Sequence, residues 1–372
     1  MDGLYWQDGG SMIEGYPGYL TIDLQALMRN YRQLAALAAP AATAAVVKAD
    51  AYGLGAARVA PALAQAGCRH FFVAHAGEAL ALRKLLPPDA QLMVLNGLLP
   101  GSEAACAEAG IVPVLNTLEQ LARWQELAAA RRQALPALLQ FDTGMSRLGF
   151  APEERAALKQ ALAQGPRLDL RYVMSHLACA DEPEHAQNAA QLAEMGKVAA
   201  QFAPVPLCFA NSGGIFLGAG YHGALVRPGL ALYGGAPAPG RRMEPVVKLE
   251  VAVVQTRNVG PGAAVGYGAS FVATGPTRLA VIAAGYADGL PRSLGNKGAA
   301  YYQGVRLPIA GRVSMDSIIL DISALPEGTL GLGSLVELIG PRQSLESLAA
   351  DAGTISYEIL TSLGARYRRD YL

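Results

Sequence analysis

The sequence of 372 residues has few cysteines, little charge and no long apolar run. Its four cysteines, Cys68, Cys106, Cys179 and Cys208, lie far apart without a C-x-x-C pair, so neither a metal site nor a dense disulfide framework is indicated. The 30 Lys and Arg residues balance 30 Asp and Glu residues, which gives no general attraction to nucleic acid or to an anionic membrane. No run of about 18 uncharged apolar residues and no signal-peptide pattern is present. We therefore expect a cytoplasmic protein whose partner is a small molecule.

What the chain does contain is a repeated pattern between residues 44 and 229. Each repeat is a short apolar run, a turn and a segment with helical periodicity, as in Leu118–Gln133. The eight apolar runs are Ala44–Lys48, Phe71–Ala74, Leu92–Asn96, Ile111–Leu115, Ala137–Asp142, Arg171–His176, Pro206–Ala210 and Ala224–Arg227. Eight such units are the number that closes a (β/α)8 TIM barrel, with an open doubly wound sheet as the alternative.

The pattern changes after about residue 240. Residues 246–258, 278–284, 318–322 and 334–339 are β-rich runs broken by Gly and Pro, and the Pro- and Gly-rich residues 234–241 are typical of a linker. The sequence therefore predicts an α/β barrel followed by a mostly β C-terminal domain. We assign residues 1–17 to a disordered extension, 18–240 to the barrel and 241–372 to the β-rich domain.

Polar residues follow the predicted barrel strands. In a barrel of this kind, side chains at the C-terminal ends of the strands converge on the active site. The strand-end residues are Lys48, His75, Asn96, Asn116, Asp142, His176, Asn211, Ser212 and Arg227. We expect them to form a ring of convergent polar groups.

Lys48 directly follows the apolar stretch TAAVV, so its stem leaves the core at the barrel mouth. A lysine at a strand end is ordinarily a surface ion-pair partner. The alternative is a desolvated amine with a lowered pKa that forms a Schiff base.

The segment that begins at Lys48, KADAYGLG, resembles the pyridoxal-phosphate lysine motif of the bacterial alanine racemases, a fold-type III family. Eight further segments are similar to that family in the same order: FDTGMSRLG, SHLACADE, ANSGG, VRPGLALYG, GYGAS, GYADGLPR, GRVSMD and SYEILTSLGAR. The resemblance spans residues 18–372. It implies a barrel followed by a β domain, pyridoxal 5'-phosphate as cofactor, and interconversion of L- and D-alanine.

The resemblance implies two catalytic acid/base groups, Lys48 and Tyr267, because racemisation needs a proton removed on one face and delivered on the other. A basic tyrosine needs cationic or hydrogen-bonding neighbours, and the family places His176 and Arg227 there. The alternative for Tyr267, which lies between glycines, is an aromatic side chain on an edge strand without a catalytic role.

Cofactor binding is implied at a further set of residues. Arg227 would pair with the pyridine nitrogen and keep it unprotonated, since a guanidinium does not give up its proton. Without the resemblance, the pattern of Arg227 at a strand end before Pro and Gly predicts only a structural capping role. The phosphate donors would be Tyr52, Tyr357, Ser212 and the amides of Gly229 and Leu230. Asn211 and Ser212 also fit a helix N-cap.

The substrate groups implied by the resemblance lie in both domains. Arg147 would hydrogen-bond the cofactor phenolic oxygen and the substrate carboxylate, and Met315 and Tyr286 would line the pocket. In the family, residues equivalent to Asp181, Arg292, Arg312 and Asp316 line the entrance to the active site and the layer around it. For Arg292, a surface ion pair is an equal alternative. In the family, the tyrosine equivalent to Tyr267 comes from the second subunit, which implies a homodimer with shared active sites.

The chain departs from the family pattern at three positions. Gln140 stands where members commonly have a carbamylated lysine that braces the arginine equivalent to Arg147, so a neutral amide or another ion must hold Arg147. Leu54 replaces a histidine, and Ser314 replaces a cysteine. Weaker binding of the substrate carboxylate by Arg147 would widen the substrate range, for example to serine.

Two other functions remain as alternatives. A fold-type III decarboxylase of basic amino acids needs a cysteine in the C-terminal domain, yet all four cysteines fall in the predicted barrel. A non-catalytic pyridoxal-phosphate carrier is a lone barrel without the domain that contains Tyr267. The sequence does not distinguish a role in peptidoglycan precursor supply from one in alanine catabolism.

Overall fold

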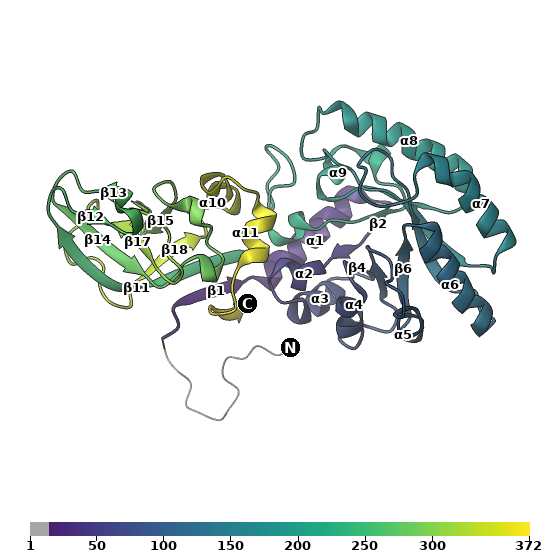
Figure 1. The fold of residues 1–372 in the computed structure, drawn as a ribbon, viewed down its shortest axis with the longest axis horizontal. Coiled ribbons are helices and arrows are strands. Elements are labelled where there is room, and N and C mark those ends of the chain that lie inside the picture. Colours follow the sequence, from purple (N-terminus) through teal and green to yellow (C-terminus); the bar gives the residue numbers. More distant parts are fainter. Residues whose placement is uncertain (1–14) are drawn as a thin grey trace, which may run out of the picture. The chain divides into compact units, whose positions relative to one another are not determined.

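A computed structural model describes residues 15–372, and the first fourteen residues of the predicted extension lie outside this range. The chain forms two compact units (Figure 1). One comprises Ala26–Glu244, and the other combines the described part of Met1–Gln25 with Pro245–Leu372.

The first unit is a closed parallel barrel. Its strands are β2 (Ala42–Thr43), β3 (Ala45–Val46), β4 (His70–Val73), β5 (Gln91–Val94), β6 (Ile111–Leu115), β7 (Pro136–Gln140), β8 (Asp169–Met174), β9 (Leu207–Cys208) and β10 (Leu225–Val226). Short β2 and β3 are two halves of one strand, interrupted at Ala44. Since β2 pairs with β10 and β3 pairs with β4, the ring closes, and the predicted (β/α)8 barrel is confirmed over an open sheet.

Helices alternate with these strands along the chain. They are α1 (Leu24–Ala38), α2 (Lys48–Tyr52), α3 (Ala56–Gln65), α4 (Ala76–Arg83), α5 (Glu103–Glu108), α6 (Leu118–Arg131), α7 (Arg155–Gln164), α8 (Ala186–Phe202) and α9 (Ser212–Phe216). The long helix α8 buries Asn188, Gln191, Met195, Val198 and Phe202, a spacing of three to four residues that forms one inward face.

The second unit is mostly β, as predicted. Its strands are β1 (Gly18–Ile22), β11 (Val247–Val259), β12 (Ala264–Val265), β13 (Phe271–Val272), β14 (Thr277–Ile282), β15 (Ala299–Tyr302), β16 (Val305–Pro308), β17 (Ile318–Asp321), β18 (Leu335–Ile339) and β19 (Arg368–Tyr371). The main sheet has the order β16-β15-β18-β11-β1-β19, with β14 and β17 added through β11. Helices α10 (Leu345–Ala352) and α11 (Ser356–Ser362) follow near the end.

The structure corrects the expected start of the barrel at residue 18. Strand β1 lies in the β unit, antiparallel to β11 and parallel to β19. Its burial alternates residue by residue, which suits a strand in a sheet with one face covered. Barrel strand β6, by contrast, is buried at every position.

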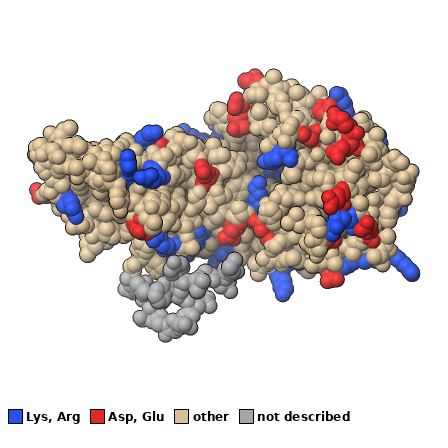
Figure 2. Space-filling model, in the orientation of Figure 1, with Lys and Arg blue, Asp and Glu red and all other residues tan. Residues whose placement is uncertain are grey.

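Surface chemistry agrees with the balanced charge of the sequence. On the face drawn in Figure 2, cationic and anionic side chains are interspersed across a mostly uncharged surface. Within residues 15–372, none of the helices combines the length and the apolar character needed to cross a bilayer.

Candidate active site

Lys48 stands at the start of α2, two residues after the end of barrel strand β3 at Val46. The next four residues, Ala49 to Tyr52, all have left-handed backbone conformations, with φ between 52° and 57°. Each such L-residue costs about 1–2 kcal/mol relative to the right-handed region. A strained turn therefore follows the lysine, and the surrounding contacts must hold it in place.

Two carboxylates hold that turn. Glu78 Oε1 accepts a hydrogen bond from the Ala49 amide at 2.6 Å, and its Oε2 accepts from the Ala74 amide at 2.7 Å. Asp50 Oδ1 accepts from the Ala56 amide at 2.7 Å, which ties the turn to α3. The role of Glu78 was not predicted, although a glutamate three residues after a helix N-cap, here His75, is a recognisable helix-start signal.

The surroundings of Lys48 change its acid–base behaviour. Burial lowers the pKa of its amine, and the charges of Arg147 and Arg227 lower the same pKa further, while Glu78 opposes them. An amine with a lowered pKa is neutral, and so nucleophilic and basic, at a lower pH than an ordinary lysine.

Arg227 is 2% exposed at the end of β10. Its Nε donates to Cys208 Sγ at 3.2 Å, and its Nη2 donates to the Ser175 carbonyl at 2.6 Å. Nη1 has no hydrogen-bond acceptor among the described residues. This arrangement fixes the plane of the guanidinium and leaves the two N–H donors of Nη1 for a bound group.

His176 shares this environment. Burial lowers the pKa of its imidazole well below the ordinary value, and the charges of Arg227, Arg147 and Lys48 act in the same direction. His176 is therefore neutral at pH 7, and the barrel brings these four predicted residues into electrostatic contact.

An anion cradle lies on the same unit. Ser212 Oγ accepts from the amides of Gly229, at 2.9 Å, and Ala231, at 3.2 Å. A Cβ on Gly229 would fall 2.1 Å from Tyr52 Oη, so only glycine allows the phenol this close to the backbone. The hydroxyls of Ser212 and Tyr52, together with the amide of the neighbouring Leu230, are a donor set that fits a phosphate.

Some strand-end residues hold the backbone instead of pointing into a common site. Asn211 caps α9 by accepting from the Gly214 amide at 2.9 Å, and Asn116 Nδ2 donates to the Leu95 and Val114 carbonyls. Asp142 Oδ1 accepts three amides of its own loop, and His75 is exposed. The expected ring of convergent groups is therefore wrong for His75, Asn116 and Asp142.

Arg147 is exposed, and it forms no hydrogen bond or ion pair with any described residue. Gln140 is 5% exposed, and its side-chain amide likewise has no hydrogen-bond partner in residues 15–372. The expectation that a neutral amide or another ion holds Arg147 is not met by any described contact.

Three side chains assigned to substrate or acid/base roles lie exposed on the β unit: Tyr267, Met315 and Tyr286 are 70%, 52% and 44% exposed. The loops of the last two are joined, because the Tyr286 amide donates to the Ser314 carbonyl and the Ala287 amide to the Met315 carbonyl, each at 3.0 Å.

An ion pair between a buried carboxylate and a partly exposed arginine supports these loops. Asp288 is 2% exposed, and its two oxygens accept from Arg366 Nε at 2.6 Å and Nη2 at 2.7 Å. Arg366 also donates to Asp316 at 2.7 Å, and Asp288 Oδ2 accepts from the Gly285 amide at 2.9 Å. Asp288 and Arg366 were not predicted, since they lie 78 residues apart in sequence.

The remaining predicted residues are exposed to different extents. The Arg312 guanidinium lies 3.0–3.4 Å from where a Cβ on Gly268 would be, beside Tyr267. Asp181 and Arg292 are exposed, on the barrel and β units respectively. Tyr357 is 41% exposed on α11.

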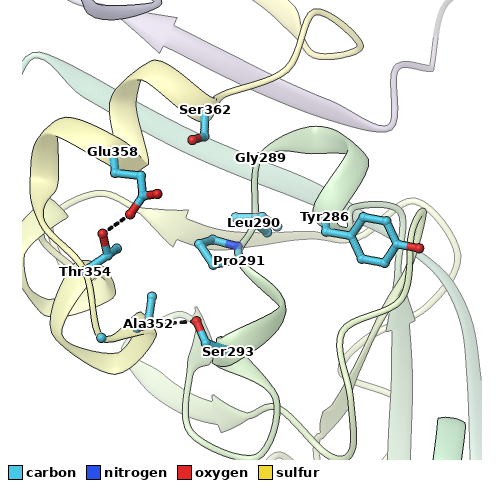
Figure 3. Close-up of a pocket in the computed structure, with 10 residues that line it drawn as sticks. Tyr286, Gly289, Leu290, Pro291, Ser293, Ala352, Thr354, Glu358 and Ser362 are labelled. Atoms are coloured by element: carbon cyan, nitrogen blue, oxygen red, sulfur yellow. Dashed lines mark hydrogen bonds between the residues drawn. The ribbon is translucent and has the colours of Figure 1, made fainter.

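A cavity of about 410 Å³ opens on the β unit between the 286–293 loop, α10 and α11 (Figure 3). Pro291, Ser293, Thr354 and Glu358 line it, and the Tyr286 ring extends away from these residues. Its described lining contains neither Lys48 nor Arg227, so this cavity is not the site where the cationic barrel residues meet.

Comparison with known proteins gives matches over nearly the whole chain. The family description "Alanine racemase, N-terminal domain" matches residues 22–237, and "Alanine racemase, C-terminal domain" matches residues 246–371. A protein of Agrobacterium fabrum named "Alanine racemase, catabolic" is 64% identical over 362 residues, which are 96% of this chain and 93% of the relative. A protein of Rhizobium johnstonii with the same name is 60% identical, covering 97% and 96% of the two chains.

Solved structures give a similar result. The alanine racemase of Bartonella henselae, described with covalently bound pyridoxal phosphate, matches with a TM-score of 0.92 and 46% identity, over 96% of this chain and all of that one. The biosynthetic alanine racemase of Pseudomonas aeruginosa matches with a TM-score of 0.88 and 34% identity, over the same shares.

Proposed function

The chain belongs to the alanine racemase family, and from this premise we propose that Lys48 and Tyr267 are the two acid/base groups of its reaction. The chain is a pyridoxal-phosphate-dependent isomerase that interconverts L- and D-alanine. The observation that carries the residue assignment is the Lys48 amine, whose pKa is lowered by burial and by Arg147 and Arg227.

Racemisation needs one group that removes the α-proton and another that delivers a proton to the opposite face. When bound, pyridoxal phosphate supplies the electron sink that makes the α-proton acidic enough to remove. Lys48 in its neutral form accepts the proton on one face, and the Tyr267 phenol serves the other.

The cofactor's anionic and ring groups are held by residues of different character. Tyr52, Ser212 and the Leu230 amide would bind the phosphate, with Tyr357 as a further hydroxyl donor, and the Gly229 amide would join them on release from Ser212 Oγ. Arg227 would present its unused Nη1 to the ring nitrogen as a permanent cation. His176 stays neutral beside Arg227, and Asn211 acts through the turn that it caps.

Substrate contacts complete the assignment. Arg147 binds the substrate carboxylate, and its lack of a protein partner leaves its guanidinium available. Met315 and Tyr286 line the pocket, while Asp181, Arg292, Arg312 and Asp316 surround its entrance. The neutral Gln140 leaves Arg147 without an ionic brace, so we propose that serine is accepted alongside alanine, which a panel of L-amino acids would test.

The active site is shared between two subunits of a homodimer. Tyr267, Met315 and Tyr286 are exposed, which suits side chains that enter a site on a second copy. Mixing two inactive variants, Lys48→Ala and Tyr267→Ala, tests this directly. Random pairing makes half of the dimers mixed, each with one intact site, so about a quarter of the wild-type activity should return. If the mixture stays inactive although the subunits exchange, the shared site is wrong.

The reaction class is tested with L-alanine in deuterium oxide. Racemisation gives D-alanine with deuterium at the α-carbon, a decarboxylase releases carbon dioxide, and a carrier changes nothing. All four cysteines lie in the barrel unit and are free, so a decarboxylase that needs a cysteine in its C-terminal domain is disfavoured.

A cytoplasmic location is the setting that suits four free cysteines. The 64% and 60% identical relatives are both named catabolic, which favours alanine catabolism over peptidoglycan precursor supply. Cell fractionation tests the location. Growth of a deletion strain on alanine, with and without added D-alanine, tests the role.

A further inference from the structure

Two glutamines of α8 contact the loop that carries Arg147, and the reaction as described gives them no role. Gln187 Nε2 donates to the Gly144 carbonyl at 2.6 Å. One helical turn later, Gln191 Nε2 donates to Thr143 Oγ1 at 3.2 Å. The spacing of four residues places both amides on one side of the helix, facing the same loop.

Gln191 also binds the segment after β8. It is fully buried; its Nε2 donates to the His176 carbonyl at 2.9 Å, and its Oε1 accepts from the Ala178 amide at 2.9 Å. Its side chain thus joins the loop of Arg147 to the segment of His176. A buried amide with its donors and acceptor paired holds a single geometry, because any shift leaves a polar group unsatisfied.

The same connection reaches Arg227. Thr143 Oγ1 lies 2.7 Å from Ser175 Oγ, and the Ser175 carbonyl accepts from Arg227 Nη2 at 2.6 Å. Gln191 is therefore one end of a continuous chain of contacts that ends on the guanidinium.

The other hydrogen bonds of the loop that carries Arg147 stabilise its internal conformation more than its position relative to the barrel. Asp142 Oδ1 accepts from the amides of Gly144, Met145 and Ser146, which are bonds internal to the loop. Gln140 and Arg147 add no side-chain hydrogen bond to any residue of the described chain.

Helix α8 is a firm base for such a contact. Glu194 on α8 pairs with Arg155 of α7 at 2.7 Å, and the arginine is 6% exposed. Met195, Val198 and Phe202 of α8 are buried in the core of the barrel unit.

We propose that Gln187 and Gln191 are positioning residues that hold the loop of Arg147 so that its guanidinium is preset for the substrate carboxylate. The inference rests on the proposed role of Arg147.

The first test is Gln187→Glu, which keeps the length of the side chain and removes the donor. Gly144 is exposed, so its carbonyl can bind water and the fold should be retained. We expect the KM for alanine to rise roughly 3- to 10-fold with little change in kcat, the effect of one lost hydrogen bond. Gln201→Ala, at an exposed glutamine of the same helix, is the matched control and should change neither constant.

The second test measures the loop itself in protein without substrate. Amide hydrogen exchange across residues 143–148 should accelerate in Gln187→Glu by roughly the same 3- to 10-fold as the KM, and by more in Gln191→Leu. It should not change in Gln201→Ala. Exchange at the wild-type rate in both loop-contact variants would overturn the proposal, whatever their activity.

A third variant separates this inference from the proposed function. Arg147→Ala should raise the KM for alanine, and Gln187→Glu should add nothing in that background because both act through one guanidinium. An unchanged KM in Arg147→Ala would contradict the substrate role of Arg147, while faster loop exchange in the glutamine variants would still support the anchoring. A further rise in the double variant would overturn the positioning role.

Discussion

Lys48 shows how the surroundings of one side chain decide its chemistry. Burial and two neighbouring arginines lower the pKa of its amine, whereas Lys297 lies exposed in the β unit. We expect Lys48→Ala to abolish the covalent retention of pyridoxal phosphate, measured by mass after borohydride reduction, and Lys297→Ala to retain it. Cofactor still attached to the Lys48→Ala protein would show that another lysine is responsible.

His176 gives a prediction for the dependence of stability on pH. Its pKa in the folded protein is well below the value near 6.5 of an unfolded histidine. The unfolded state therefore binds the proton first, and the free energy of unfolding falls as the pH drops below about 6.5, by at most about 1.4 kcal/mol per pH unit for one group.

Between pH 7.5 and 5, the free energy of unfolding of His176→Gln, measured in urea, should fall less steeply with decreasing pH than that of the wild type. Burial also lowers the pKa of His70, so His70→Gln should remove a separate contribution to the pH dependence of the free energy of unfolding. His75→Gln, at an exposed position, is the control. Equal slopes in the wild type and in His176→Gln would mean that His176 is protonated alike in both states.

At the scale of elements, the left-handed turn after Lys48 stores strain that glycine would release. Ala49 is exposed with φ 52°, so Ala49→Gly should stabilise the protein by about 1 kcal/mol. The matched change Ala122→Gly, at an exposed position inside right-handed α6, should destabilise it by about 1 kcal/mol. Denaturant midpoints of the two variants should move in opposite directions; shifts of the same sign would contradict the strain.

The elements also show what the sequence could predict. Each of the eight apolar runs overlaps a barrel strand, because a strand buried on both faces needs a continuous run of apolar residues, although several strands begin one or two residues before the run. The supports of the site depend on distant partners: Gln191 meets Thr143 across 48 residues, and Arg366 meets Asp288 across 78. No local pattern marks such a pair, since glutamine and arginine are ordinary surface residues until the fold brings them together.

At the scale of the whole molecule, the β unit depends on β1. Leu20 is fully buried in this strand, between β11 and β19. Leu20→Ala should lower the free energy of unfolding by about 2–5 kcal/mol, whereas Leu99→Ala, at a residue that is 77% exposed, should change it little.

Limited proteolysis locates the effect. New cleavage sites in Leu20→Ala should appear within residues 245–372, far along the chain from the substitution, if β1 supports that sheet. Cleavage confined to residues 26–244 would show that the strand instead stabilises the barrel.

The pairing of β1 with β19 sets an order of events during synthesis. Residues 19–22 are translated before the barrel segment, yet their parallel neighbours, residues 368–371, are translated after it. The barrel between them has all of its strands available long before translation ends, since domains fold as units when their chain is complete. The nascent protein must therefore hold β1 without its β19 neighbour until residues 368–371 have been made, so that part of the sheet is completed only after the whole barrel segment has been translated.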